Sequence, residues 1–273
     1  MNIGYIIGLV LAIAVMVLGM MGFPTIQPEL IANFFDGPSV MIVIGCTIGV
    51  VMASFPLKAV LSLPKHFGVM LKNPKQKPET IINQLVDLAQ IARKDGLLAL
   101  EEKANEQDDP FFKQAIMLIV DANDPDRVRM TLENDIECMS DRHNAVAALY
   151  DKASAVAPAF GMVGTLVGLI NMLKRMDPTS GSSNIGQDMG TALITTLYGC
   201  VLAHMIFGPV ANNLRIRDAD EVLNKMIIVE GITCIQAGEN PKLLREKLLT
   251  FVAQKQREKM GDAPSGSGGG EGA

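Results

Sequence analysis

Apolar residues in this chain gather in four long windows that contain no Lys, Arg, Asp or Glu. A hydrocarbon core of about 30 Å is crossed by about 20 helical residues at ~1.5 Å each, and every window meets that length. The pattern therefore predicts four transmembrane helices, at residues 1–23, 37–57, 153–173 and 189–214. The first window lacks a basic start and is longer than the apolar stretch of a signal peptide, so we expect it to be retained.

The segments outside these windows are polar and show helical periodicity. In the loop 58–152, apolar residues recur at helical spacing over 79–93, and Gly96 marks the expected helix end. Similar spacing predicts further helices over 215–264. The Gly- and Ser-rich end, 265–273, is typical of a disordered tail. We therefore expect an all-α fold, a polytopic membrane protein with a helical domain outside the bilayer.

The distribution of Lys and Arg predicts the orientation in the membrane. Thirteen of the 24 basic residues lie in the loop 58–152 and nine follow the fourth window, whereas two lie between the third and fourth windows. Basic residues favour the cytoplasmic side. The loop 58–152, the segment 215–264 and both termini are therefore expected in the cytoplasm.

The composition excludes several classes of protein. Apolar residues make up 49% of the 273 and charged residues only 19%, and the mean hydropathy of +0.27 argues against a single soluble globule. A net charge of −5 with 5% aromatic residues argues against nucleic-acid binding. The four cysteines form no C-x-x-C pair, and no cluster of His, Cys and acids suggests a metal site or a catalytic centre. We expect neither enzyme activity nor a cofactor.

The four windows lack the acid that an ion pathway needs. None contains a carboxylate, and His204 is the only other titratable side chain well inside one, apart from tyrosines and cysteines. A lone imidazole near the end of a span more often bonds a neighbouring helix, so His204 is not assigned to a site. Intramembrane acids usually handle transported ions. If this chain moves ions, a partner must supply the acid.

The third and fourth windows carry small and polar residues instead. Pro158 cannot donate a hydrogen bond to the carbonyl of Ser154, which predicts a bent helix with a free acceptor. Thr165 follows seven residues later on nearly the same face, and Thr196 supplies a hydroxyl in the fourth window. The small residues expected to serve helix packing near this face are Gly161, Gly164, Gly168 and Gly199. The pattern alone allows ion contact or ordinary helix packing.

Opposite charges flank Gly96 in the loop. Arg93 and Lys94 precede it, and Glu101 and Glu102 follow after a short apolar run. Such a cluster is either a solvated surface, whose ion pairs contribute ~0–1 kcal/mol, or a docking surface for a partner of complementary charge.

Three stretches of the sequence resemble the MotA/PomA family, the A subunits of bacterial flagellar stators. They are VAPAFGMVGTLVGLINML in the third window, ALITTLYG in the fourth and ARKDGLLALEE in the loop. The resemblance implies an all-helical subunit of the bacterial inner membrane, with five copies surrounding two B subunits of the MotB/PomB type. Each B subunit would bring one membrane helix with an essential aspartate and a peptidoglycan-binding domain. The complex would use Na⁺ or H⁺ to drive torque on the rotor protein FliG.

The resemblance also implies roles for individual residues. Pro158 matches the family proline that lies beside the B-subunit aspartate. Thr165 and Thr196 match two threonines implicated in transient Na⁺ coordination, which favours Na⁺ over H⁺. The residues that match the rotor-binding charges are Arg93, Lys94, Glu101 and Glu102. Ala155 and Ala104 stand where some relatives carry acids, which leaves the ion entry route and the full rotor contact open.

Two other functions remain open at this point. An ExbB/TolQ-type energiser shares the arrangement of A subunits around B subunits, but it usually has three spans and lacks the charge pattern around Gly96. A self-contained transporter should show sequence repeats and intramembrane charges of its own, and neither is present.

Overall fold

The computed structural model describes residues 3–22, 26–63, 66, 68, 77–175, 185–254 and 257. These residues are helical apart from short connections. Three helices are long and apolar enough to cross a membrane, Gly37–Ser54, Pro125–Arg175 and Ile185–Gln236, and a shorter apolar helix covers Ile7–Met20. The expected all-α fold with long apolar helices is thus confirmed. The count of four spans stays a prediction, and the tail 265–273 lies outside the described residues.

The chain folds as two compact units. The first comprises residues 1–73 and 142–216, and the second comprises residues 74–141 and 217–273. Two long helices contribute to both, α9 (Pro125–Arg175) and α11 (Gly208–Gln236). The predicted windows are bounded by charged residues, whereas α9 continues well beyond its apolar window. The domain boundaries expected from the sequence therefore stay predictions.

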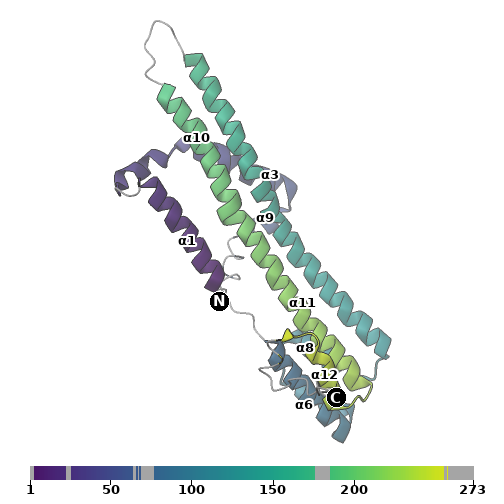
Figure 1. Ribbon diagram of the computed structural model, residues 1–273. Helices are drawn as coiled ribbons and strands as arrows, with labels where there is room; N and C mark the ends of the chain where they lie inside the picture. The colour runs from purple at the N-terminus through teal and green to yellow at the C-terminus, as the bar shows by residue number, and fades with distance from the viewer. Residues whose placement is uncertain are drawn as a thin grey trace, which may run out of the picture. The chain divides into compact units, whose positions relative to one another are not determined.

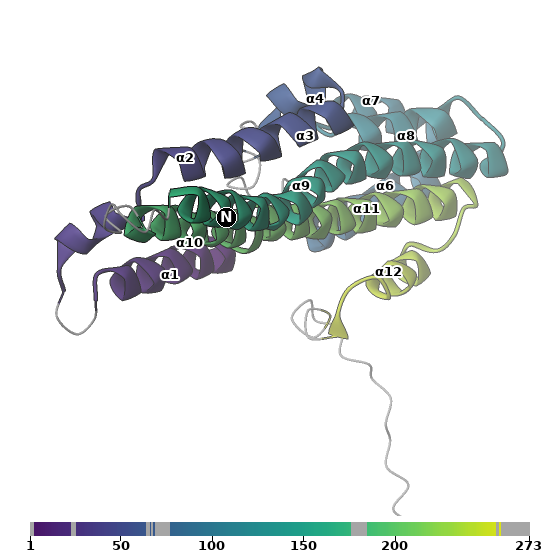
Figure 2. The same ribbon diagram turned by 90° about the horizontal axis from the view of Figure 1, so that it is seen from above.

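The first unit is built around the pairing of α9 with α10 (Figure 1). Figure 2 shows α1 on one side of α10 and the α2–α3 stretch on the other. The elements of this unit, besides its parts of α9 and α11, are α1 (Ile3–Met20), η1 (Pro28–Phe34), α2 (Gly37–Val40), η2 (Met41–Gly45), α3 (Cys46–Ser54), α4 (Leu57–Leu61), α10 (Ile185–Val201) and η4 (Leu202–Phe207). Asp36 begins α2 because its carboxylate accepts a hydrogen bond from the backbone N–H of Ser39 at 2.9 Å.

The second unit has an apolar core formed by short helices and the polar parts of α9 and α11. Its other elements are α6 (Pro78–Asp95), η3 (Leu97–Ala99), α7 (Leu100–Asn105), α8 (Pro110–Val120) and α12 (Pro241–Leu249). Helix α6 starts with a proline, which has no N–H to leave unpaired, and ends at Gly96, whose φ of +85° favours glycine. Its buried face is Ile81, Ile82, Leu85, Leu88 and Ala89, which pack into the core at helical spacing.

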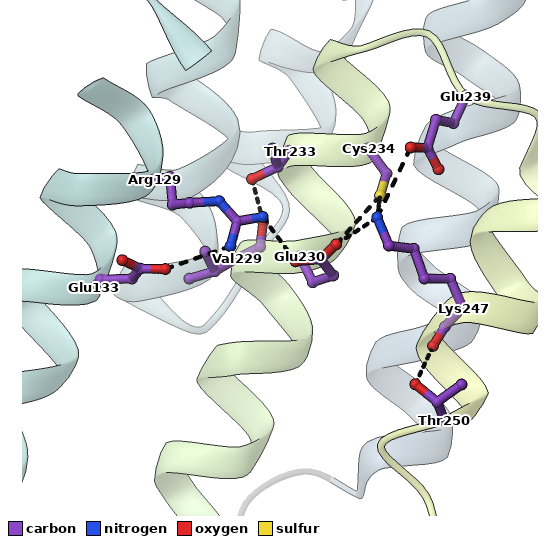
Figure 3. A network of polar contacts seen from close by, with 9 residues as sticks. All are labelled: Arg129, Glu133, Val229, Glu230, Thr233, Cys234, Glu239, Lys247 and Thr250. Carbon is purple, nitrogen blue, oxygen red and sulfur yellow. Dashed lines mark hydrogen bonds and ion pairs between the residues drawn. The ribbon is translucent and has the colours of Figure 1, made fainter. Parts of the chain in front are cut away.

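A polar network joins three helices of the second unit (Figure 3). Glu230 of α11 accepts from Arg129 of α9 at 2.8 Å and from Nζ of Lys247 of α12 at 2.5 Å. Lys247 also lies 3.3 Å from Sγ of Cys234. The Glu230 side chain is only 16% exposed, so both cations are held against a largely buried carboxylate. The network therefore ties α12 to the rest of the unit.

The pKa values of these groups follow from their contacts. Burial raises the pKa of Glu230, but hydrogen bonds from Lys247 and Arg129 outweigh it and hold the pKa below the ordinary value of 4.5. The hydrogen bond to Glu230 raises the pKa of Lys247. Burial raises the pKa of the Cys234 thiol to about 11. Because the pKa of Glu230 is lowered in the folded state, its stabilisation is present above pH 4.5 and is lost as the pH falls through the lowered value.

Removal of the shared acceptor should destabilise the protein. Glu230→Ala leaves Arg129 and Lys247 without their common carboxylate, and we expect it to lower the free energy of unfolding by about 1–3 kcal/mol. Glu133→Ala is the matched control, because Glu133 is 44% exposed and lies 3.4 Å from Arg129. It should cost less than about 0.5 kcal/mol. Thermal unfolding of the full-length variants tests this, and equal losses from both would contradict it.

Candidate functional site

Glycines bring the backbones of α9 and α10 into near contact. A Cβ atom on Gly164 would lie 2.5 Å from the side chain of Thr195, and one on Gly168 would lie 2.8 Å from the carbonyl oxygen of Asp188. A Cβ on Gly161 would lie 3.1 Å from the carbonyl oxygen of Thr195. Only residues without a side chain permit this approach. We call this contact the α9–α10 seam.

Pro158 lies at one end of the described seam. It stands inside α9, where it can donate no hydrogen bond to the carbonyl of Ser154. A Cβ atom on Gly199 would lie 2.7 Å from the carbonyl oxygen of Ala157 and 3.0 Å from Cα of Pro158. The hydroxyl of Ser154 donates to the carbonyl of Ala203 at 3.0 Å. This turn of α9 is thus packed directly on the α10–η4 helix.

The two candidate threonines stand on different helices of the seam, and their hydroxyls bond the carbonyls of two adjacent residues of α9. Thr165 is half-exposed, and its hydroxyl donates to the carbonyl of Met162 in its own helix. The hydroxyl of Thr196 lies across the seam, 3.5 Å from the carbonyl of Gly161. No hydrogen bond joins the two threonines in the described part of the chain. Thr195 is fully buried, and its hydroxyl is satisfied by carbonyls of its own helix.

One face of α9 is apolar and exposed in the single chain. The stripe nearest to Pro158 and Thr165 is between 40% and 63% exposed and comprises Met162, Leu166, Leu169 and Leu173. The helix surface beyond this stripe is also apolar and is 37–51% exposed at Val163, Val167 and Ile170. At 100° per residue this stripe lies roughly 140° around the helix from the glycines of the seam. Pro158 and Thr165 fall between the two faces. Both therefore border a surface that lipid or another helix must cover.

The structure reveals a buried acid that the sequence analysis did not assign. Asp188 lies in the first turn of α10 and is 7% exposed. The fourth window predicted from the sequence begins at residue 189, because a charge-free stretch cannot include Asp188. The helix itself starts at Ile185. A test for helix starts, rather than for uncharged stretches, would have included it.

The four candidate rotor residues all lie on the surface of the second unit. Arg93 and Lys94 stand in the last turn of α6, and Glu101 and Glu102 stand in the first turn of α7. All four are exposed, and no ion pair joins them to one another among the described residues. Ala104, in contrast, is fully buried in the core of this unit.

Comparison with known proteins decides the family. Residues 103–226 match the model of the MotA/TolQ/ExbB proton channel family. Motility protein A of Borreliella burgdorferi is 36% identical over 266 residues, which cover 97% of this chain and 100% of that protein. The chain belongs to the Motility protein A family. Chemotaxis protein PomA of Vibrio alginolyticus is 38% identical to this chain, over 83% of this chain and 88% of PomA.

A solved structure shares the fold of this Motility protein A family member. The flagellar MotAB stator complex from Bacillus subtilis contains a chain that matches with a TM-score of 0.85 and 31% identity, over 94% of this chain and 98% of that one. The resemblance found in three sequence stretches is thereby confirmed over nearly the whole chain. The matched family model describes a channel rather than a class of enzyme.

The close packing at the seam predicts that an added side chain at Gly199 is destabilising. Gly199→Ala places a methyl group against backbone atoms of Ala157 and Pro158, which cannot rotate away, and should cost about 1–3 kcal/mol of stability. Gly190→Ala in the same helix is the control, because nothing lies within 4 Å of its Cβ position. We expect Gly199→Ala to lower both the thermal midpoint and swimming in a strain lacking its own copy. Wild-type behaviour of Gly199→Ala would show that the helices separate freely here.

Proposed function

We propose that this chain is the A subunit of a flagellar motor stator, which conducts ions together with a MotB/PomB-type subunit and applies torque to the rotor protein FliG. The observation that carries this proposal is the exposed apolar stripe of α9, bordered by Pro158 and Thr165. A partner helix placed on this stripe would lie beside a proline turn, a free backbone acceptor and a hydroxyl. That arrangement suits a helix that carries the acid of an ion pathway.

The proposed assembly is the one that the family resemblance implies. Five A subunits around two B subunits in the inner membrane, with the termini in the cytoplasm, would cover the stripe of α9 with protein. The solved MotAB complexes that this chain resembles support a B-subunit partner. The apolar windows contain no acid, which supports a pathway completed by the B subunit's membrane aspartate.

Thr165 and Thr196 support Na⁺ as the transported ion. A sodium ion that sheds water needs replacement oxygens, whereas a proton needs the partner's carboxylate and a chain of water. Because Thr165 donates its proton to the carbonyl of Met162, the lone pairs of its oxygen stay free to meet a cation. The same bond also favours the second candidate, an H⁺-driven stator, in which Thr165 only bonds its own backbone.

Substitution of Thr165 separates the two ions. Thr165→Val removes the oxygen at nearly constant volume, and we expect it to raise the sodium concentration for half-maximal swimming by about fivefold or more, which corresponds to ~1 kcal/mol. Thr165→Ser keeps the oxygen and should restore the wild-type response. Swimming speed is measured across a sodium titration at fixed pH with a protonophore control. An unchanged titration for Thr165→Val leaves the H⁺-driven stator as the function.

The charges around Gly96 support the contact with FliG. Arg93 and Lys94 are cationic and exposed, and Glu101 and Glu102 are anionic and exposed, so the surface presents both signs without internal pairing. Charge on such a surface steers encounter and fixes register.

Charge reversal tests the rotor surface. The double variant Arg93→Glu with Glu101→Lys should abolish or severely reduce torque while leaving membrane insertion and co-purification with the B subunit intact. The matched control reverses Lys103 and Glu106, which pair with each other at 2.8 Å on the surface of the same unit. Bead rotation on tethered motors measures torque. Full torque in the Arg93/Glu101 variant would make this cluster a solvated surface.

A further inference from the structure

Asp188 has a carboxylate oxygen that nothing in the described chain satisfies. Its Oδ1 lies 3.4 Å from Nη1 of Arg175, the last residue of α9. Its Oδ2 is buried and has no hydrogen-bond partner among the described residues. A buried polar atom without a partner costs free energy, and an unpaired buried charge costs more. Oδ2 is therefore available to accept a proton or a small cation.

The contact with Arg175 does not satisfy both oxygens of the Asp188 carboxylate. At 3.4 Å the pair is long, and the Arg175 side chain is 55% exposed, so solvent weakens the attraction. The arginine also reaches only one of the two oxygens. Arg175 is nevertheless a positive charge at the same carboxylate, so it competes with any cation that binds there.

The position of Asp188 connects it to the seam. On α10 it shares a buried face with Ala192, Thr195 and Gly199, and its carbonyl oxygen meets Gly168 of α9. The positive-inside rule places the 174–188 connection on the outer side of the membrane. Asp188 thus lies at the outer end of the seam, and Pro158 lies further along it.

We propose that Asp188 binds one small monovalent cation, Na⁺ or H⁺, at the outer end of the α9–α10 seam, and so concentrates the ion where it enters the stator. This inference rests on the proposed function and adds to it an entry residue on the A subunit. A helix N-terminus also favours an acid in its first turn. The alternative is therefore that Asp188 forms only a structural ion pair with Arg175, and the experiment must distinguish this ion pair from a cation site.

A pair of variants in the assembled stator separates the two explanations. A cation site predicts that the variants shift the ion response in opposite directions, and a structural ion pair predicts shifts in the same direction. Asp188→Asn removes the binding charge and should raise the half-saturating ion concentration for swimming by about fivefold. Arg175→Gln removes the competing charge and should lower it by about twofold to fivefold. If Asp188 and Arg175 form only a structural ion pair, both variants break that pair and shift the half-saturating ion concentration in the same direction. Asp188→Glu keeps the charge and should behave like the wild type.

The measurement is swimming speed titrated with sodium at fixed pH, and then with pH at fixed sodium. Opposite shifts on the sodium axis assign Na⁺ to Asp188, and opposite shifts on the pH axis assign H⁺. Shifts in the same direction, or no shift on either axis while the wild-type chain still restores swimming, overturn the inference and leave the stator function standing. Failure of the wild-type chain itself to restore swimming would overturn the proposed function. Should Asp188→Asn fail to assemble, Arg175→Gln alone decides, since only a cation site predicts tighter ion binding.

Discussion

The close approach of α9 and α10 is the constraint on which the first unit depends. It requires residues without side chains at three positions of α9 and at Gly199, and it fixes which face of α9 is left over. Because the glycines are turned toward α10, the large apolar residues of the same helix point elsewhere and stay exposed. The packing of one pair of helices thereby creates the surface that a partner helix can occupy.

The same contact explains how an internal proline is tolerated. A proline inside a helix costs about 3 kcal/mol or more when nothing compensates. Here the turn around Pro158 is held by the backbone of Gly199, and the neighbouring Ser154 hydroxyl bonds the carbonyl of Ala203. This turn of α9 is therefore packed on its α10 side, and Pro158 itself is half-buried. A helical turn that lacks one backbone hydrogen bond and is packed on one side only can bend in response to a charge change on the other side.

The sequence predicted the helices well where periodicity and charge agreed, as at Pro78–Asp95, whose buried face and glycine end are both visible in the pattern. The glycines named in the third and fourth windows lie at the α9–α10 contact, but spacing alone does not select them, because Gly45 and Gly49 have the same spacing and nothing within 4 Å of their Cβ positions. The sequence could not predict which backbone carbonyls accept hydrogen bonds from the threonine hydroxyls, because that depends on the side-chain rotamer and on the neighbouring helix. It also missed Asp188, because windows free of charge cannot contain a buried acid. The Glu230 network was equally invisible, since Arg129 lies 101 residues from Glu230 in sequence and the packing of α12 on α11 depends on the fold of the connecting turn.

We propose that the exposed face of α9 forms half of an ion pathway whose acid comes from another subunit. Ion flux into sealed vesicles tests this most directly, with the A subunit alone, with the A and B subunits together, and with the B-subunit membrane aspartate changed to asparagine. We expect flux only for the complete complex with its aspartate intact. Substantial flux through the A subunit alone would contradict it.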